Sequence, residues 1–151
     1  MDWAFLGQLG VVLCFGMGAL GSALGIMVAG TAAAGAWAKD ARAGKPIIFT
    51  YIIFVAAPLS QTLYAMIVMT KLNTAIAQAG ASAGLLFGIG LATGLGELVS
   101  AWGQGVIGAA ACRCLSEGEG KGLAFLIIAI GIIETVGIFS FAFMLGMVPS
   151  A

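Results

Sequence analysis

The chain has 151 residues, of which 62% are hydrophobic and only 8% are charged. Soluble domains carry about 25% charged residues, so this composition excludes a water-soluble globular protein and indicates a chain that lies in lipid. The net charge of zero gives no indication of nucleic-acid binding, and the absence of histidine removes the commonest metal ligand and acid–base group near neutral pH.

Charged residues divide the chain into four long apolar segments. Each segment exceeds the roughly 20 residues that a helix needs to cross the hydrocarbon core of a membrane. Helices satisfy the backbone hydrogen bonds of such a segment internally. We therefore predict an all-α membrane protein with four transmembrane helices, at about residues 3–38, 47–70, 83–112 and 122–148. The first and third are long enough to protrude beyond the membrane.

The polar loops carry most of the basic residues. Two loops, at 39–46 and 113–121, contain Lys39, Arg42, Lys45, Arg113 and Lys121. Only Lys71 lies near the small polar connection at 73–82. Basic residues favour the cytoplasmic side of a membrane, so we expect both loops in the cytoplasm and both chain ends outside.

The second half of the chain repeats the first. Phe15-Gly16-Met17-Gly18 corresponds to Phe87-Gly88-Ile89-Gly90, and Gln61-Thr62 corresponds to Glu134-Thr135. Because each half contains two spans, both halves run in the same direction through the membrane. We predict two tandem helical hairpins, residues 1–75 and 76–151.

Glycine is concentrated in the first and third helices and is absent from the second. Small residues let helix backbones approach closely in lipid, so we expect the first and third helices to pack against each other. This pattern fits two arrangements. One is a single packed bundle, and the other is a closed ring of identical chains with these two helices on the inside.

Glu134 lies midway along the fourth helix. A carboxylate at the centre of a bilayer is costly and typically marks an ion site or pathway. We therefore interpret Glu134 as the residue that carries the chemistry. The alternative is a protonated structural glutamate that is hydrogen-bonded to a neighbouring helix.

The second helix carries a polar face. Ser60, Gln61 and Tyr64 lie within an arc of about 100° at the helical period. Pro58 lacks a backbone N–H and leaves a carbonyl group one turn earlier unpaired. Together these groups offer several oxygen ligands at one depth. The alternative is that Pro58 only kinks the helix while the polar groups join neighbouring helices.

The third helix adds Gln104 and Glu97, which are seven residues apart on nearly the same face. Their separation along the helix axis is about 10 Å. We expect Gln104 to reach a site shared with Gln61 and Glu134. Glu97 is too distant for the same ligand shell, and two interpretations remain open: a protonated structural residue, or a residue that faces the interior of a ring.

The candidate donors comprise a carboxylate, two amides, a hydroxyl and a phenol, all of them oxygen ligands suited to a hard cation or to a proton. One negative charge balances one monovalent cation. The sequence contains no phosphate-binding loop and no pairing of a nucleophile with a base. We therefore predict a protein that does not itself catalyse covalent chemistry.

These residues resemble the proteolipid, or K/c subunit, of V-type and A-type rotary ATPases. The resemblance covers essentially the whole chain and is closest to the duplicated four-helix form of sodium-pumping bacterial V-type enzymes. Its motifs are the glycine-rich first helix, the Pro58-x-Ser60-Gln61-x-x-Tyr64 pattern and the mid-membrane Glu134. The resemblance implies a Na⁺ site with Tyr64 beside it and a set of ligands formed by Ser60, Gln61, Gln104, Glu134 and the backbone carbonyl of Ala57.

The resemblance also implies a function and partners. Identical subunits would form a closed ring in a prokaryotic plasma membrane and turn against a stator subunit with an essential Arg. A central-stalk subunit would attach to the cytoplasmic loops, and ATP chemistry would take place in a separate sector. Each subunit would carry Na⁺ at Glu134, with H⁺ as the alternative. Alternatives from other classes are a passive ion channel or small transporter, and a structural membrane scaffold.

This sequence departs from the family pattern at two positions. Ser60 stands where the best sodium binders have Thr, and Glu97 is not part of the pattern. The first departure bears on the identity of the ion. The second leaves the role of Glu97 open.

Overall fold

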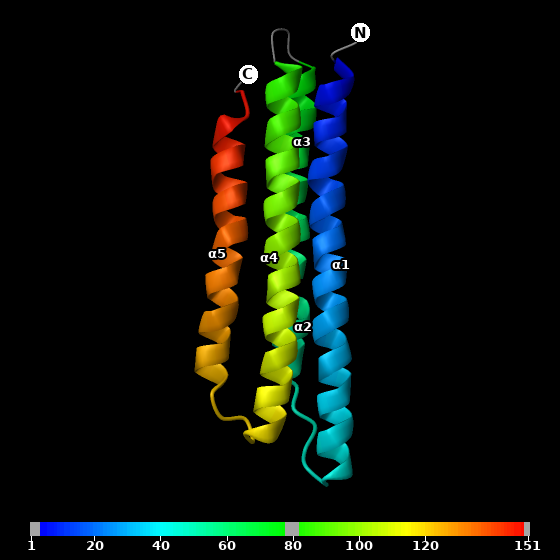
Figure 1. Ribbon diagram of the computed structural model, residues 1–151, viewed down its shortest axis with the longest axis vertical. Coiled ribbons are helices and arrows are strands. Elements are labelled where there is room, and N and C mark those ends of the chain that lie inside the picture. The colour runs from blue at the N-terminus through cyan, green and yellow to red at the C-terminus, as the bar shows by residue number, and fades with distance from the viewer. Residues whose placement is uncertain (1–3, 78–81, 150–151) are drawn as a thin grey trace.

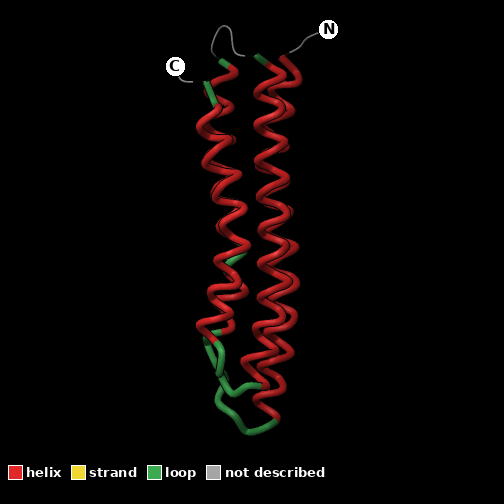
Figure 2. Tube along the Cα trace, turned by 60° about the vertical axis from the view of Figure 1, so that its left-hand side comes forward, coloured by secondary structure: helices red, strands yellow, loops and turns green. Residues whose placement is uncertain are grey.

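A computed structural model describes residues 4–77 and 82–149, which form four rods of helix that lie side by side (Figure 1). The rods comprise α1 (Ala4–Arg42), α2 and α3 in succession (Tyr51–Ala56 and Leu59–Ile76), α4 (Ala83–Glu117) and α5 (Leu123–Met147). No strand occurs in the described residues (Figure 2). Each rod is long and apolar enough to cross a membrane. The predicted all-α fold with four membrane-length helices is therefore confirmed.

The two hairpin loops lie at the same end of the bundle. One loop joins α1 to α2, the other joins α4 to α5, and the first and last described residues lie at the opposite end (Figure 1). This arrangement agrees with two hairpins that run in the same direction. Which end faces the cytoplasm stays a prediction.

The helices extend beyond the apolar segments that predicted them. α1 continues to Arg42, α4 to Glu117, and α3 passes Lys71 and ends at Ile76. A charged residue ends a hydrophobic segment, but its backbone still continues a helix. The 39 residues of α1 span about 58 Å, against a hydrocarbon core of about 30 Å, so this helix is long enough to protrude as expected. The predicted start at residue 3 and the middle of the connection at 73–82 lie outside the described residues.

The second rod is not one continuous helix, as predicted for residues 47–70. It begins only at Tyr51, and it is interrupted at Pro58, which has no N–H for the carbonyl group one turn earlier. At this break the Ala57 carbonyl accepts hydrogen bonds from the Ser60 backbone N–H at 3.4 Å and from Ser60 Oγ at 3.0 Å. The break therefore turns a backbone oxygen toward a side-chain hydroxyl.

The first and third rods, α1 and α4, pack backbone to backbone. A Cβ atom on Gly90 would overlap the backbone of Gly10, and a Cβ atom on Gly105 would overlap that of Gly25. The helices reach this distance because glycine carries no side chain. The predicted contact between the two glycine-rich helices is confirmed within the chain.

Buried apolar side chains form two clusters. One contains Phe54 and Leu115 and lies toward the hairpin loops, and the other contains Leu72 and Ile89 and lies toward the chain ends. Between them the helices bury polar side chains, which we call the polar layer: Ser22, Gln61, Thr93, Glu97, Ser100 and Gln104. The polar layer therefore lies near the middle of the bundle.

α5 is the most exposed of the long helices. Only Ile130 and Gly137 of its 25 residues are buried, whereas α4 buries fifteen. Large apolar side chains such as Phe125, Ile132 and Phe143 remain exposed. An apolar surface of this extent requires lipid or further protein around it.

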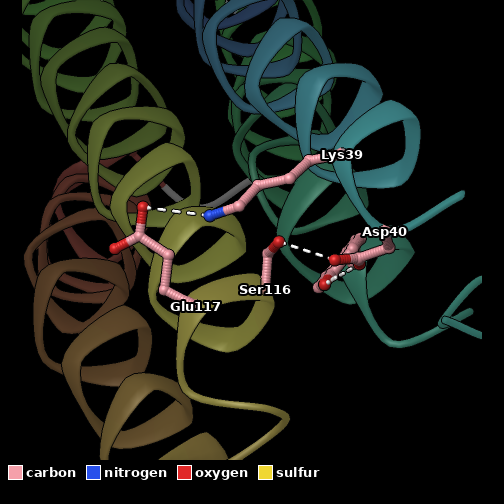
Figure 3. A network of polar contacts seen from close by, with 5 residues as sticks. Lys39, Asp40, Ser116 and Glu117 are labelled. Carbon is pink, nitrogen blue, oxygen red and sulfur yellow. Dashed lines mark hydrogen bonds and ion pairs between the residues drawn. The ribbon is translucent and has the colours of Figure 1, made fainter. Parts of the chain in front are cut away.

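At the hairpin-loop end, Asp40 joins three helices (Figure 3). Its carboxylate is 2% exposed and accepts hydrogen bonds from Ser116 Oγ and Tyr51 OH, both at 2.7 Å. Nearby, Lys39 and Glu117 form an exposed ion pair at 3.4 Å, of a kind that contributes about 0–1 kcal/mol. The buried hydrogen bonds of Asp40, rather than the ion pair, hold the ends of α1, α2 and α4 together.

Candidate functional site

The polar layer meets α5 at Glu134. Ser60 Oγ lies 3.2 Å from Glu134 Oε1, 2.8 Å from Gln61 Oε1 and 3.0 Å from the Ala57 carbonyl oxygen. Three acceptor oxygens from two of the rods thus surround one hydroxyl group. The structure brings together four of the residues that the sequence singles out.

The Ser60 hydroxyl has one proton and donates it to only one of these oxygens at a time. The other two contacts then join oxygens with no hydrogen between them, which is unfavourable inside a bundle. A proton on Glu134 supplies a hydrogen for one of these two contacts, whereas a cation among the oxygens removes the conflict at both. Oxygen ligands lie about 2.3–2.6 Å from Ca²⁺, a hard cation close to Na⁺ in radius, so neighbouring ligands lie about 3–3.5 Å apart. The spacing around Ser60 fits either occupant.

Gln61 connects this junction to α4 and α5. Its side chain is fully buried, and its Nε2 donates to Ser100 Oγ at 3.3 Å. Ser100 Oγ in turn donates to the carbonyl oxygen of Ile133 at 3.0 Å, directly before Glu134 in the chain. With its nitrogen turned toward Ser100, Gln61 presents its carbonyl oxygen to Ser60.

Helix α1 is hydrogen-bonded to the interrupted segment at Pro58. Ser22 Oγ donates to the Pro58 carbonyl at 2.6 Å, and Thr62 Oγ1 donates to Ser22 Oγ at 2.7 Å. Neither hydroxyl is among the site residues expected from the sequence, and Ser100 is also missing from them. Ser100 carries a usable signal, because it lies one helical turn from Gln104 on the same face. The sequence gives no such signal for Ser22, because Ser22 lies among the glycines of α1.

Gln104 and Glu97 are both fully buried on α4. Within the described part of the chain, neither the Gln104 amide nor the Glu97 carboxyl group has a hydrogen-bond partner. Gln104 is therefore not hydrogen-bonded to Gln61 or Glu134 within one chain, and its place among the ligands stays a prediction. The carboxyl group of Glu97 lies near the Gln61 amide, although no hydrogen bond joins the two groups.

Tyr64 joins α3 to α5. Its ring stacks on that of Phe141, with centroids 5.1 Å apart and planes inclined by 26°. The phenol is also close enough to interact with the Glu134 carboxyl group. Tyr64 thus lies beside the junction, in a position from which it can hold Glu134 in place.

An open groove leads to Glu134 from the outside of the bundle. It has a volume of about 620 Å³ and is lined by α2, α3 and α5, with Ser60 and Glu134 among otherwise apolar residues. Glu134 is half-buried in this groove, whereas Gln61 is fully buried behind it. An ion therefore has access to the carboxylate from the groove, which Ser60 and Ala57 also line, and Gln61 lies on the inner side.

Two comparisons with known proteins agree. The family model that describes the C subunit of ATP synthase matches residues 9–70 and 87–147, once in each hairpin. The K subunit of the A-type ATP synthase of Methanocaldococcus jannaschii is 33% identical over 132 residues. That alignment covers 85% of this chain and 56% of the relative, so the chain spans little more than half of the relative's length.

Proposed function

This chain belongs to the family of ATP synthase C subunits, and from that premise we propose that it is a rotor-ring subunit of an A/V-type rotary ATPase that carries Na⁺ across the membrane. The similarity to the K subunit of an A-type ATP synthase supports the type of complex. The observation that supports sodium is the convergence of three acceptor oxygens on the Ser60 hydroxyl beside Glu134. The subunit moves ions and leaves ATP chemistry to another sector.

In the proposed ring, α1 and α4 of each chain face the central axis. These helices pack closest together within the chain, through glycine contacts such as Gly25 with Gly105. α5 then lies toward the outside, where its exposed apolar side chains meet lipid and the neighbouring chain. Glu134 reaches the outer surface through its groove, where the stator is able to approach it.

Rotation then depends on the charge of Glu134. An ionised carboxylate cannot face lipid at low energy, so an empty subunit is held at the stator, where an essential Arg compensates the charge. A bound cation neutralises the carboxylate and lets the subunit turn into the bilayer. The ligands around Ser60 thus act as a switch between a charged and a neutral surface.

Sodium is favoured over a proton by the number of oxygens at the site. A proton on Glu134 needs one acceptor, whereas a dehydrated Na⁺ needs several oxygens to replace its hydration shell. Ser60, Gln61 and the Ala57 carbonyl provide these oxygens without adding charge, so the filled site is neutral. H⁺ is the second candidate, because a protonated Glu134 supplies a hydrogen for its own contact with Ser60.

The surroundings of the polar layer argue against a passive channel. A channel places polar groups along the length of its pore. In this chain the polar layer lies between two buried apolar clusters, which favours a discrete site at one depth. A purely structural scaffold has no need for the open groove at Glu134.

The proposed partners follow from the two ends of the bundle. The hairpin loops carry the basic residues and would face the cytoplasm of a prokaryotic cell, where a central-stalk subunit attaches. The buried Asp40 network stiffens this end of each chain. The opposite end, with the first and last described residues, would lie outside the plasma membrane.

ATP-driven uptake of sodium ions into vesicles that contain the complete ATPase tests the proposal. The wild-type complex should accumulate Na⁺ even when an ionophore has collapsed the proton gradient. Glu134→Gln should abolish uptake while the ring still assembles, because the amide keeps the size of the side chain and removes its exchangeable charge. Sodium uptake that vanishes with the proton gradient, or normal uptake by the variant, would contradict the proposal.

A further inference from the structure

Glu97 is a buried ionisable group for which the proposed ion site has no use. Its side chain is fully buried on α4, and neither carboxyl oxygen has a hydrogen-bond partner among the residues that the structure describes. A carboxyl group without partners is costly to bury in a membrane. Such a group is retained where it acts on something nearby, so its surroundings identify its role.

The carboxyl group of Glu97 and two site residues face the same point on α5. A Cβ atom built on Gly137 would lie 2.9 Å from both Glu97 Oε2 and Ser100 Oγ, and 3.0 Å from Gln61 Nε2. The three polar atoms therefore lie within roughly twice that distance of one another. They pack over Gly137 because this position has no side chain. We call Glu97, Ser100 and Gln61 the Gly137 cluster.

The hydrogen-bond needs of this cluster are complementary. The Gln61 amide nitrogen has two hydrogens, and one of them is donated to Ser100 Oγ. The Ser100 hydrogen is donated to the Ile133 carbonyl, so Ser100 has none left for Glu97. Among the described residues, the second Gln61 hydrogen therefore has no acceptor and the Glu97 carboxyl group has no donor.

We propose that Glu97 is a positioning residue that accepts a hydrogen bond from the Gln61 amide, directly after a small rotation of its carboxyl group or through one buried water, and thereby keeps the Gln61 carbonyl oxygen on the ion side. Turning the amide over would place its oxygen against the Glu97 oxygens, which repel it. It would also place N–H groups against Ser60 and the cation. An ionised Glu97 imposes this orientation because it has acceptor oxygens only, whereas a protonated carboxyl group also has an O–H that can donate to a turned amide.

This role deepens the proposed function and rests on it, because it makes Glu97 a determinant of ion selectivity. Sodium needs the carbonyl oxygen of Gln61, whereas a proton on Glu134 has Ser60 as its partner. Loss of Glu97 should therefore weaken Na⁺ binding and leave the protonation of Glu134 unchanged. A residue that only stabilised the fold would affect both.

Carbodiimide labelling of Glu134 in the assembled ATPase separates the two effects, because the reagent modifies only the protonated carboxyl group. Mass spectrometry of the peptide that contains Glu134 excludes any signal from Glu97. The experiment compares Glu97→Met, which keeps the side-chain length and removes the acceptor, with Glu97→Gln, which keeps an acceptor oxygen. For each protein it measures the Na⁺ concentration that halves labelling and the pH dependence of labelling without Na⁺.

We expect the half-protecting Na⁺ concentration to rise about 10- to 100-fold in Glu97→Met, the range typical of residues that orient a metal ligand. Glu97→Gln should lose less protection than Glu97→Met, because it keeps an acceptor oxygen but adds N–H donors, and the pH profile without Na⁺ should be the same in all three proteins. Unchanged protection in Glu97→Met, equal losses in both variants, or a pH profile that shifts with the loss would each overturn the inference. Glu97→Leu makes the same comparison if Glu97→Met does not assemble. Absence of Na⁺ protection in the wild type would instead reject sodium as the transported ion.

Discussion

The two hairpins place corresponding residues in different surroundings. Gln61 of the first hairpin is fully buried between helices, whereas Glu134, its counterpart in the second, is half-buried at an open groove. The next residues differ in the same way. Thr62 donates across helices to Ser22, and Thr135 donates to a carbonyl group of its own helix. The comparison shows that the first hairpin provides neutral ligands and interhelical contacts, while the second presents the charge.

This division has a physical reason. A carboxylate at mid-membrane depth is costly, so a further one at position 61 would need its own partners inside the bundle. A glutamine at this position presents a carbonyl oxygen to Ser60 and N–H groups to Ser100, and it adds no charge. On the proposed function, one charge per four helices lowers the number of ions moved per turn and suits work against a steep gradient.

Exchanging the two residues would break this comparison most severely. The double variant Gln61→Glu, Glu134→Gln moves the carboxylate from the second hairpin to the first. We expect complete loss of ATP-driven sodium uptake, because a carboxylate at position 61 lies behind the groove and cannot exchange its ion at the outer surface. The single variant Glu134→Gln serves as the reference for complete loss. Recovery of uptake in the double variant would show that the two positions are equivalent.

A methyl group at Gly137 should disturb the contact between the hairpins. Gly137→Ala places a Cβ atom against Glu97, Ser100 and Gln61, so it should displace the Gln61 amide. We expect the Na⁺ concentration that halves labelling of the site carboxylate to rise about tenfold. Gly146→Ala is the matched control on the same helix, because its Cβ would meet nothing within 4 Å. Equal protection in the two variants would rule out steric control by the Gly137 cluster.

Within each hairpin, one helix is expected inside the ring and the other outside. Gly16 on α1 and Ile67 on α3 are both exposed in the single chain. With exposed Cys114 replaced by Ser, Gly16→Cys should cross-link neighbouring chains several-fold more than Ile67→Cys, because the inner helices are crowded. Disulfide-linked dimers on a non-reducing gel measure the difference. The reverse order of cross-linking would place α3 inside and argue against this arrangement.

The two threonines offer the finest test of the comparison. Thr62→Val removes an interhelical hydrogen bond, which in membranes contributes about 0.6 kcal/mol on average. Thr135→Val removes only a bond within its own helix, so its effect should be smaller. Thermal dissociation of the purified ring measures both. Equal shifts in the two variants would mean that the Thr62–Ser22 contact has no special role.

The sequence predicts the membrane helices well because the thickness of the bilayer sets the length of an apolar segment. It does not predict where the helices end. Lys71 ends the apolar segment, yet α3 continues to Ile76, and Arg113 lies within α4. The interruption at Pro58 is also only partly predicted, because the missing N–H indicates a weak point but does not give the resulting geometry.

The candidate site is predictable where its residues share one helix face. Ser60 and Gln61 follow from the helical period, and Glu134 follows from its depth. The position of Glu97 beside Gln61 cannot be predicted from the sequence. The spacing of Glu97 and Gln104 along their own helix does not determine how that helix is shifted relative to its neighbours. The role of Ser22 is not predictable for a related reason, since its hydrogen-bond partner is the backbone carbonyl of Pro58 in another part of the chain.

The most direct test of the account is the protection of Glu134 by sodium at fixed pH. In the assembled wild-type ATPase, carbodiimide labelling of Glu134 should fall as Na⁺ is raised to millimolar concentrations, while an organic cation at equal ionic strength should have no effect. This result would show that Na⁺ replaces the proton at the site beside Ser60. Labelling that follows pH but does not respond to Na⁺ would contradict the account and indicate a rotor driven by protons.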